Sequence, residues 1–295
     1  MSDYIISCCT IADLNKEHFE ARDIKYACMR YSIGDEQYAD DLGVSVPYHE
    51  FYERMAAGEI THTSQINPVE YMEYFKSIME GDKPIIHLTL SSGLTGTFNS
   101  ARAGAGMLMD DYPNLKIFVV DSLGASSGAG LLVDAMADRR DEGMSIEELY
   151  DWTLENRLKL NHWFFSTDLK YYVRGGRISK TEGFVGSMLK ICPLCNMDNE
   201  GHLIPREKVR TKKKVISTIV ERMEQYAEGG LDYSGKCFVS HSDCYEDARA
   251  VADLVEEKFP KLKGKVEINY IGTIVGSHTG PGTVALFFWG RERTE

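Results

Sequence analysis

Hydroxyl-bearing residues and glycines cluster in one short segment, LSSGLTGTF, at residues 90–98. The segment follows an apolar run, KPIIHLTL, that is typical of a buried strand, and it leads into a stretch that is typical of a helix. A hydroxyl-rich loop before a helix suits an anion, because side-chain hydroxyls and free backbone N–H groups both donate hydrogen bonds. From this segment alone the anion could be a phosphate that is transferred, an ester that is attacked or a carboxylate that is held.

A second segment, GLDYSGKC at residues 230–237, nearly matches a Walker-type phosphate loop. Cys237 stands where a Ser or Thr hydroxyl should reach Mg²⁺. The expected context is also reversed, because a Walker loop follows a strand and opens a helix, whereas this segment follows a predicted helix and enters a predicted strand. We therefore do not expect it to bind a nucleotide.

A third segment, GASSG at residues 124–128, matches the GxSxG pattern of the nucleophile elbow in α/β-hydrolases. Residues 121–123 separate the predicted strand from the first glycine, which blunts the sharp turn that exposes such a nucleophile. A serine hydrolase that uses Ser126 or Ser127 with His278 is the alternative function that the sequence leaves open.

The segment GSHTGPG at residues 276–282 precedes an apolar run that is typical of a strand. Its three glycines and one proline predict a tight turn. We expect His278 and Thr279 in this turn to contact a polar ligand, because a histidine held in a turn is available for binding or proton transfer.

Composition restricts the class of protein. The chain has 295 residues, of which 43% are hydrophobic, and its 33 basic and 45 acidic residues give a net charge of −12. This balance argues against nucleic acid as the main partner.

No apolar run reaches the roughly 18–20 residues of a membrane span, and the N-terminus does not resemble a signal peptide, so we expect a cytoplasmic protein. Seven cysteines fit a reducing compartment, and we expect the CxxC pair at 192 and 195 to be structural or incidental.

Alternation of short apolar runs with amphipathic stretches predicts an α/β fold with two domains. Residues 1–165 are expected to form an N-terminal α/β domain with a mainly parallel sheet, and residues 166–295 a C-terminal mixed α+β domain. The predicted strands cover residues 4–8, 84–90, 115–120, 162–166, 236–240, 265–271 and 283–289, and the predicted helices cover 68–80, 97–109, 128–140, 145–160 and 212–227.

Six segments in one order resemble the DegV family of lipid-binding proteins. They extend from about residue 63 to 288, and their joint occurrence is far more specific than any one of them. The segments are TSQ (63–65), LSSGLTGTFNSA (90–101), VVDSLGASSGAG (119–130), RGGRIS (174–179), GHLIPREKVRTKKK (201–214) and SHTGPGTVALFF (277–288).

The resemblance implies a two-domain carrier protein that holds one long-chain fatty acid and is not itself an enzyme. The carboxylate would lie at the domain interface and the tail inside the N-terminal domain, where Phe98, Met107 and Leu131 are candidates for its lining. A separate fatty acid kinase would supply ATP and form an acyl phosphate on the bound lipid. No other cofactor or metal is implied.

The candidate site residues combine the hydroxyl-rich segments with nearby positive groups. Hydroxyl donors before a helix N-terminus suit a carboxylate without an ion pair, and positive groups at the entrance suit an acyl phosphate or a partner protein. The residues expected to bind the carboxylate are Thr63, Ser92, Thr95, His278 and Thr279, and those expected at the head group or the partner are Arg177 and Arg210.

Overall fold

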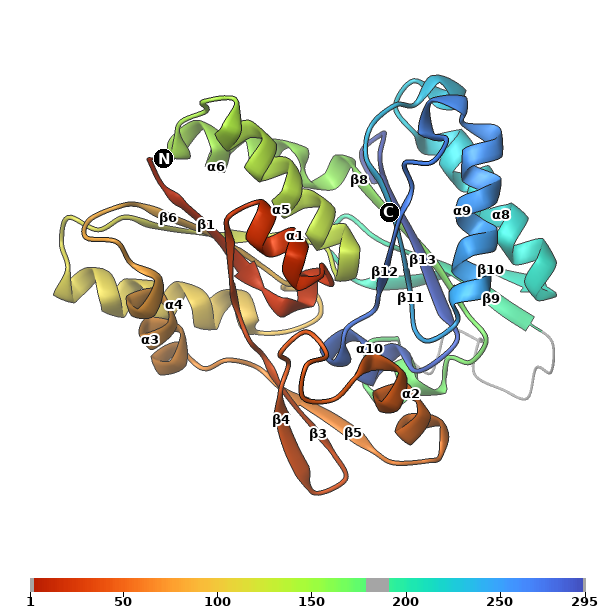
Figure 1. The fold of residues 1–295 in the computed structure, drawn as a ribbon, viewed down its shortest axis with the longest axis horizontal. Helices are drawn as coiled ribbons and strands as arrows, with labels where there is room; N and C mark the ends of the chain where they lie inside the picture. The colour runs from red at the N-terminus through yellow and green to blue at the C-terminus, as the bar shows by residue number, and fades with distance from the viewer. Residues whose placement is uncertain (1–2, 179–190, 294–295) are drawn as a thin grey trace.

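The computed structural model describes residues 3–178 and 191–293. It confirms the predicted α/β fold, with one parallel sheet, one mixed sheet and a small third sheet (Figure 1). No helix in these described ranges is long and apolar enough to cross a membrane. Short 3₁₀ segments connect several elements: η1 (Thr10–Ala12), η2 (Arg157–Lys159), η3 (Gly230–Asp232) and η4 (Pro260–Leu262).

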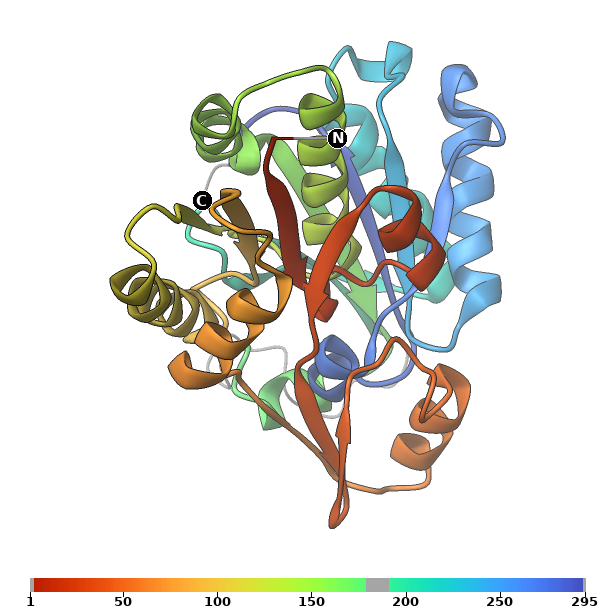
Figure 2. The same cartoon turned by 60° about the vertical axis from the view of Figure 1, so that its left-hand side comes forward.

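The first sheet is parallel throughout and is covered by helices on both faces. In spatial order its strands are β2 (Ile24–Ala27), β1 (Ile5–Cys9), β6 (Ile85–Thr89) and β7 (Ile117–Asp121). One face packs against α3 (Pro68–Ile78) and α4 (Thr97–Asp111), and the other against α1 (Lys16–Ala21), α5 (Ser126–Asp141) and α6 (Ile146–Asn156) (Figures 1 and 2). Burial on both faces explains why β1 and β6 are mostly apolar and buried along their whole length.

Two helices of this half begin at capping boxes that satisfy their first backbone N–H groups. The Ser145 side chain accepts from the backbone N–H of Glu148, whose carboxylate accepts in return from Ser145, and Asn67 and Glu70 form the same arrangement at α3. The box at Ser145 confirms the predicted start of α6.

The second sheet has six strands and packs its inner face against α5. In spatial order its strands are β10 (Leu203–Arg210), β9 (Ile191–Met197), β8 (Leu160–Ser166), β13 (Thr283–Trp289), β11 (Cys237–His241) and β12 (Glu267–Tyr270). Only the β11–β12 pair is parallel among these described strands. The outer face is covered by α8 (Lys212–Tyr226) and α9 (Tyr245–Lys258), so α5 lies between the two sheets (Figure 1).

The position of β8 bears on the division into domains. This strand pairs with β9 and β13 in the second sheet, so a boundary at residue 165 would cut through it. We propose that the chain divides just before Leu160, because a strand and its hydrogen-bonded neighbours belong to one unit.

The third sheet brings the two halves of the chain together. It consists of β4 (Glu36–Ala39), β3 (Arg30–Ile33) and β5 (Thr61–Ser64), all antiparallel, and it was not predicted. With α2 (Tyr48–Ala56) it lies beside α10 (Thr273–Thr279), which comes from the other end of the chain (Figures 1 and 2). The short α7 (Lys170–Arg174) also contacts α10.

The prediction of a turn over residues 276–282 was wrong for its first half. Residues 273–279 form α10, and the chain leaves the helix only at Gly280, whose φ is 68°. Gly276 allows a close packing contact, because a Cβ at this position would collide with the side chain of Tyr52. His278 therefore lies in the last turn of a helix rather than in a loop.

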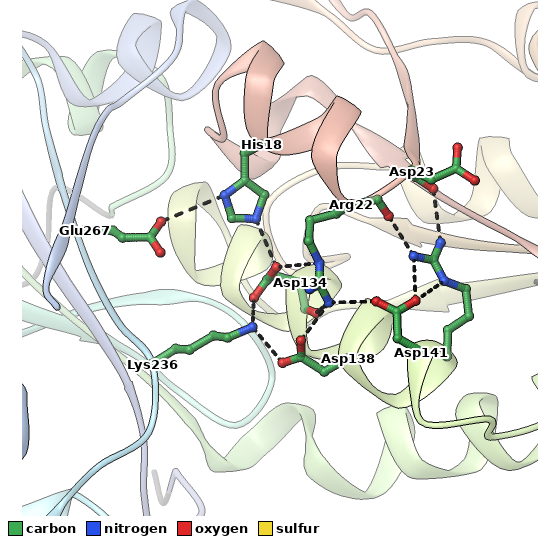
Figure 3. Close-up of polar contacts among 9 residues, drawn as sticks. His18, Arg22, Asp23, Asp134, Asp138, Asp141, Lys236 and Glu267 are labelled. Atoms are coloured by element: carbon green, nitrogen blue, oxygen red, sulfur yellow. Dashed lines mark hydrogen bonds and ion pairs between the residues drawn. The ribbon is translucent and has the colours of Figure 1, made fainter.

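A cluster of charged side chains links α1 and α5 to the second sheet (Figure 3). Asp134 of α5 has a side chain that is only 3% exposed, and His18 of α1 contacts it over 2.9 Å. Lys236, just before β11, forms ion pairs with Asp134 and with Asp138. The lysine of the near-Walker segment thus pairs with carboxylates across the boundary between the halves.

Replacing Asp134 with asparagine should destabilise the protein by about 1–3 kcal/mol, because it leaves partly buried cations without their shared carboxylate. Burial alone would raise the pKa of Asp134, but hydrogen bonds from His18 and Lys236 outweigh it and lower the pKa. The carboxylate therefore stabilises the fold above the unfolded-state pKa of about 3.9, and this contribution is lost as the pH falls through the lowered pKa.

Urea unfolding at neutral pH and below about pH 4 measures both effects. The difference between wild type and Asp134→Asn should shrink in acid. The matched control is Asp138→Asn. Because the Asp138 side chain is 34% exposed, this variant should lower the free energy of unfolding by less than about 1 kcal/mol. Equal stabilities of wild type and Asp134→Asn at neutral pH would contradict this account of the cluster.

Candidate functional site

A cavity of about 280 Å³ lies between the two halves of the molecule. Its walls come from β5, the loop before α4, the start of α5, β8, β13 and α10. The second and third sheets therefore contribute directly, and the first sheet contributes through the segments that follow β6 and β7. The apolar part of the lining is Met29, Leu90, Leu94, Ala125, Phe164, Met197, Leu203, Ile271, Ile274, Val275, Ala285 and Phe287.

Strand alternation directs one apolar row of the second sheet into this cavity. Phe164 of β8 is paired in register with Ala285 of β13, and Phe287 follows two residues later on the same face. All three side chains are largely buried. A concave apolar wall with a few polar groups at one place is the usual form of a site for an apolar ligand with a polar end.

Three predicted site residues meet at the polar part of the cavity. His278 Nε2 lies 2.8 Å from Thr63 Oγ1, and His278 Nδ1 lies 3.4 Å from Arg177 Nη1. Burial, together with the nearby charge of Arg177, lowers the pKa of His278 to about 4, so the imidazole is neutral at neutral pH.

These contacts determine which ring nitrogen of His278 carries the proton and where the hydroxyl proton of Thr63 can go. A guanidinium only donates hydrogen bonds, so Nδ1 of His278 accepts from Arg177 and Nε2 carries the proton. Nε2 then donates to Thr63 Oγ1, which leaves the hydroxyl proton of Thr63 free for an acceptor in the cavity. A carboxylate oxygen is such an acceptor.

Thr95 lies in the same cavity and is linked to Gln65. Its hydroxyl donates to Gln65 Oε1 over 3.4 Å and lies 3.1 Å from Thr97 Oγ1. The Gln65 amide in turn donates to Ser100 Oγ over 3.3 Å. Gln65 was not predicted as a site residue, although it follows Thr63 by two positions, a spacing that places side chains on one side of an extended segment.

Thr279 contributes an available hydroxyl. The residue is 6% exposed and lines the cavity, and its Oγ1 makes no hydrogen bond to any residue that the structure describes. Buried hydroxyl groups normally have a partner, so an unpaired one that faces a cavity indicates a polar ligand atom or water.

Two predicted site residues lie elsewhere. Ser92 is exposed, and its backbone N–H donates to Asp121 Oδ1 over 3.1 Å, while Arg210 is exposed at the end of β10. Neither is among the residues that line this cavity. Phe98, Met107 and Leu131 are not among them either, so the lining comes from residues that periodicity did not single out.

The described residues do not assemble the alternative serine hydrolase of Ser126 or Ser127 with His278. Ser126 has a φ of 54°, a strained conformation like that of a nucleophile elbow, but its hydroxyl donates to the buried carboxylate of Asp13. Ser127 donates to the backbone oxygen of Asp13. His278 is hydrogen-bonded to Thr63 and Arg177, so within the described part of the chain it is not the base of either serine.

His162 is a cavity residue that the sequence did not reveal. Its Nδ1 donates to the backbone oxygen of Leu160 over 3.1 Å, and its Nε2 accepts from the backbone N–H of Ala125 over 3.4 Å. Full burial, reinforced by the positive charge of Arg293, holds its pKa well below the usual value. The neutral ring therefore joins β8 to the start of α5 without placing a charge beside the apolar wall.

Comparisons with known proteins identify the family to which the chain is similar. The model of a family described as "Uncharacterised protein, DegV family COG1307" matches residues 10–291. A DegV domain-containing protein of Clostridium perfringens is 35% identical over 290 residues, which cover 98% of each chain. Among the residues that the structure describes, no group of three or more His, Cys, Asp or Glu could hold a metal ion.

Two solved structures are similar along almost the whole chain. A Bacillus subtilis structure described as DegV, a fatty acid binding protein, is 26% identical with a TM-score of 0.82, covering 99% of this chain and 100% of that one. The Streptococcus pneumoniae Fatty Acid Kinase (Fak) B3 protein loaded with linoleic acid is 22% identical with a TM-score of 0.81 and the same coverage, which shows a shared fold.

Proposed function

This chain belongs to the DegV family, and from that premise we propose that it binds one long-chain fatty acid in the cavity between its two halves. One observation supports the proposal above all. In this cavity an apolar wall lies next to a polar cluster made of Thr63, His278 and Arg177. The Bacillus subtilis relative, described as a fatty acid binding protein, supports it.

The tail and the head group would contribute differently to binding. Each methylene buried in the cavity contributes up to about 0.8 kcal/mol, so the tail supplies most of the affinity. The free hydroxyl protons of Thr63 and Thr279 suit the two oxygens of a carboxylate. Thr95 lines the same cavity and would be a third donor once its hydroxyl turns from Gln65 to the ligand. Arg177 lies behind the imidazole, so its charge acts on the carboxylate through His278.

Native mass spectrometry of the purified protein, followed by denaturation, tests this proposal. We expect a mass excess that is released as a free fatty acid, or uptake of added oleate by protein that has been stripped of lipid. A protein that carries no lipid after gentle isolation and takes up no oleate would overturn the proposal.

We further propose that the bound carboxylate is presented to a separate fatty acid kinase, which forms an acyl phosphate. The Fak B3 protein among the solved structures supports this idea. Arg177 is half-buried behind the polar group and could stabilise the added charge of an acyl phosphate, whereas Arg210 is exposed and is suited only to contact with the partner.

The kinase proposal predicts different effects for the two arginines. With a fatty acid kinase and ATP, loaded protein should yield an acyl phosphate that hydroxylamine traps as a hydroxamate. Arg177→Gln should lower its rate of formation by about tenfold or more, because a charge-assisted contact is lost, while the lipid remains bound. Arg210→Gln should raise only the concentration of loaded carrier at which the kinase reaches half of its maximal rate, and the maximal rate itself should not change. Hydroxamate formed with ATP alone would contradict the need for a separate kinase.

A further inference from the structure

A second, smaller pocket of about 230 Å³ lies on the outer face of the six-stranded sheet. Successive side chains of a strand point to opposite faces, so Asn161 and Trp163 of β8 face this pocket while His162 and Phe164 face the fatty-acid cavity. The two sites are therefore separated by the sheet, and the proposed function does not account for the outer one.

Three arginines from different elements line this pocket. Arg206 occupies the irregular position of β10 between Pro205 and Glu207, where a β-bulge shifts the register. Arg222 comes from α8 and stacks over the ring of Trp163, with its guanidinium carbon 5.6 Å from the ring centre. Arg293 follows β13 near the C-terminus.

Several donors of these arginines lack partners among the described residues. The Nε of Arg222 and both the Nε and the Nη1 of Arg293 are buried and make no hydrogen bond there. Arg293 is 6% exposed, and its Nη2 donates to the backbone oxygen of Leu123 over 2.8 Å. Burial lowers the pKa of Arg293 to about 10, which leaves it charged at neutral pH. A buried, charged donor without an acceptor is costly unless a ligand satisfies it.

Nearby carboxylates offset part of the positive charge of the pocket, but none of them is among its lining residues. Glu207 pairs with Arg222 Nη2 over 2.8 Å, but its side chain is 43% exposed, and it is not among the lining residues. Asp198 raises the pKa of Arg293, although burial outweighs this effect, and its oxygens accept from the backbone N–H groups of Glu200 and His202. The lining therefore has three arginines, one of which is paired with Glu207, and no acidic side chain, in a protein whose net charge is −12.

We propose that this pocket binds a phosphate group, either as free phosphate or as part of a small phosphate monoester. One planar carboxylate is satisfied by one guanidinium fork, whereas three guanidinium groups from three elements match the several oxygens of a phosphate. The ring of Trp163, with Tyr226 beside it at 5.6 Å between ring centres, forms a wall for the rest of a monoester.

Isothermal titration with inorganic phosphate, against chloride at equal ionic strength, tests the proposal on the full-length protein. Arg206→Gln and Arg222→Gln should each weaken phosphate binding by at least about tenfold, because each removes charge-assisted hydrogen bonds. The matched control is Arg249→Gln on α9, which removes an arginine paired with Asp253 and should leave phosphate binding unchanged. Fatty acid content should be the same in all these proteins.

Two further arms identify the source of the phosphate group. Displacement of phosphate by glycerol phosphate would support a soluble monoester, and binding to vesicles that contain phosphatidic acid, lost in Arg206→Gln, would support a lipid head group. Because Arg206 is exposed on β10, its variant should fold even if Arg222→Gln does not. The proposal would be overturned if the protein bound neither phosphate, glycerol phosphate nor the vesicles. It would also be overturned if Arg206→Gln bound phosphate as tightly as wild type.

Discussion

Replacing Thr63 with valine is expected to remove most of the preference of this protein for a free fatty acid over its methyl ester. Valine has nearly the same shape as threonine, but it lacks the hydroxyl that accepts from His278 and leaves a proton for the ligand. A hydrogen bond to a charged group contributes about 1.5–3 kcal/mol, so the preference should fall by about 10- to 150-fold. Competition between the acid and its ester for lipid-free protein measures it.

Two variants show whether this effect belongs to the hydroxyl at Thr63. Thr63→Ser retains the hydroxyl and should keep most of the preference for the acid. Ser92→Ala removes a hydroxyl that is exposed and lies outside the cavity lining, so it should behave like wild type. An unchanged preference in Thr63→Val, or an equal loss in Ser92→Ala, would mean that the head group lies elsewhere.

Filling the apolar part of the cavity should weaken binding of the whole ligand. Ala285 is 6% exposed and lies opposite Phe164 in the wall, so Ala285→Phe places a ring in the path of the tail. Each excluded methylene costs up to about 0.8 kcal/mol, and exclusion of three would weaken binding by about 2.4 kcal/mol, roughly fiftyfold. The loss should be similar for the acid and for its methyl ester, unlike the effect of Thr63→Val.

The control for Ala285→Phe is Ala56→Phe, which adds the same ring on an exposed position of α2. Urea unfolding should accompany the binding assay, because a ring forced into a packed core typically costs about 1–3 kcal/mol of stability. A folded Ala285→Phe protein that binds oleate as tightly as wild type would place the tail outside this cavity.

Most of the parallel sheet and its helices, though not β2 and α1, could be predicted because their signals are local. Strands buried on both faces are mostly apolar along their length, and the run predicted at 84–90 contains β6. The spacing of Ser145 and Glu148 marked the start of α6, which the capping box confirmed. Neither signal depends on a distant part of the chain.

The third sheet and α10 could not be predicted, because their sequences do not carry a clear local signal. The strands β3 and β4 are only four residues long and mix polar with apolar side chains, so their pattern does not stand out from a loop. Gly276 looked like part of a turn, but it permits close packing of α10 on Tyr52, a residue more than two hundred positions away in the sequence.

By itself the sequence determined the α/β class, most elements of the first half, the family resemblance and the chemical types at the site, because residue type and periodicity are local properties. Only the tertiary structure decided which of those residues act together. Thr63 and His278 are 215 positions apart and meet because the third sheet packs beside α10. Ser92 lies within the hydroxyl-rich segment at 90–98 but is exposed and outside the cavity lining, because the position of a loop residue depends on the packing of the whole fold.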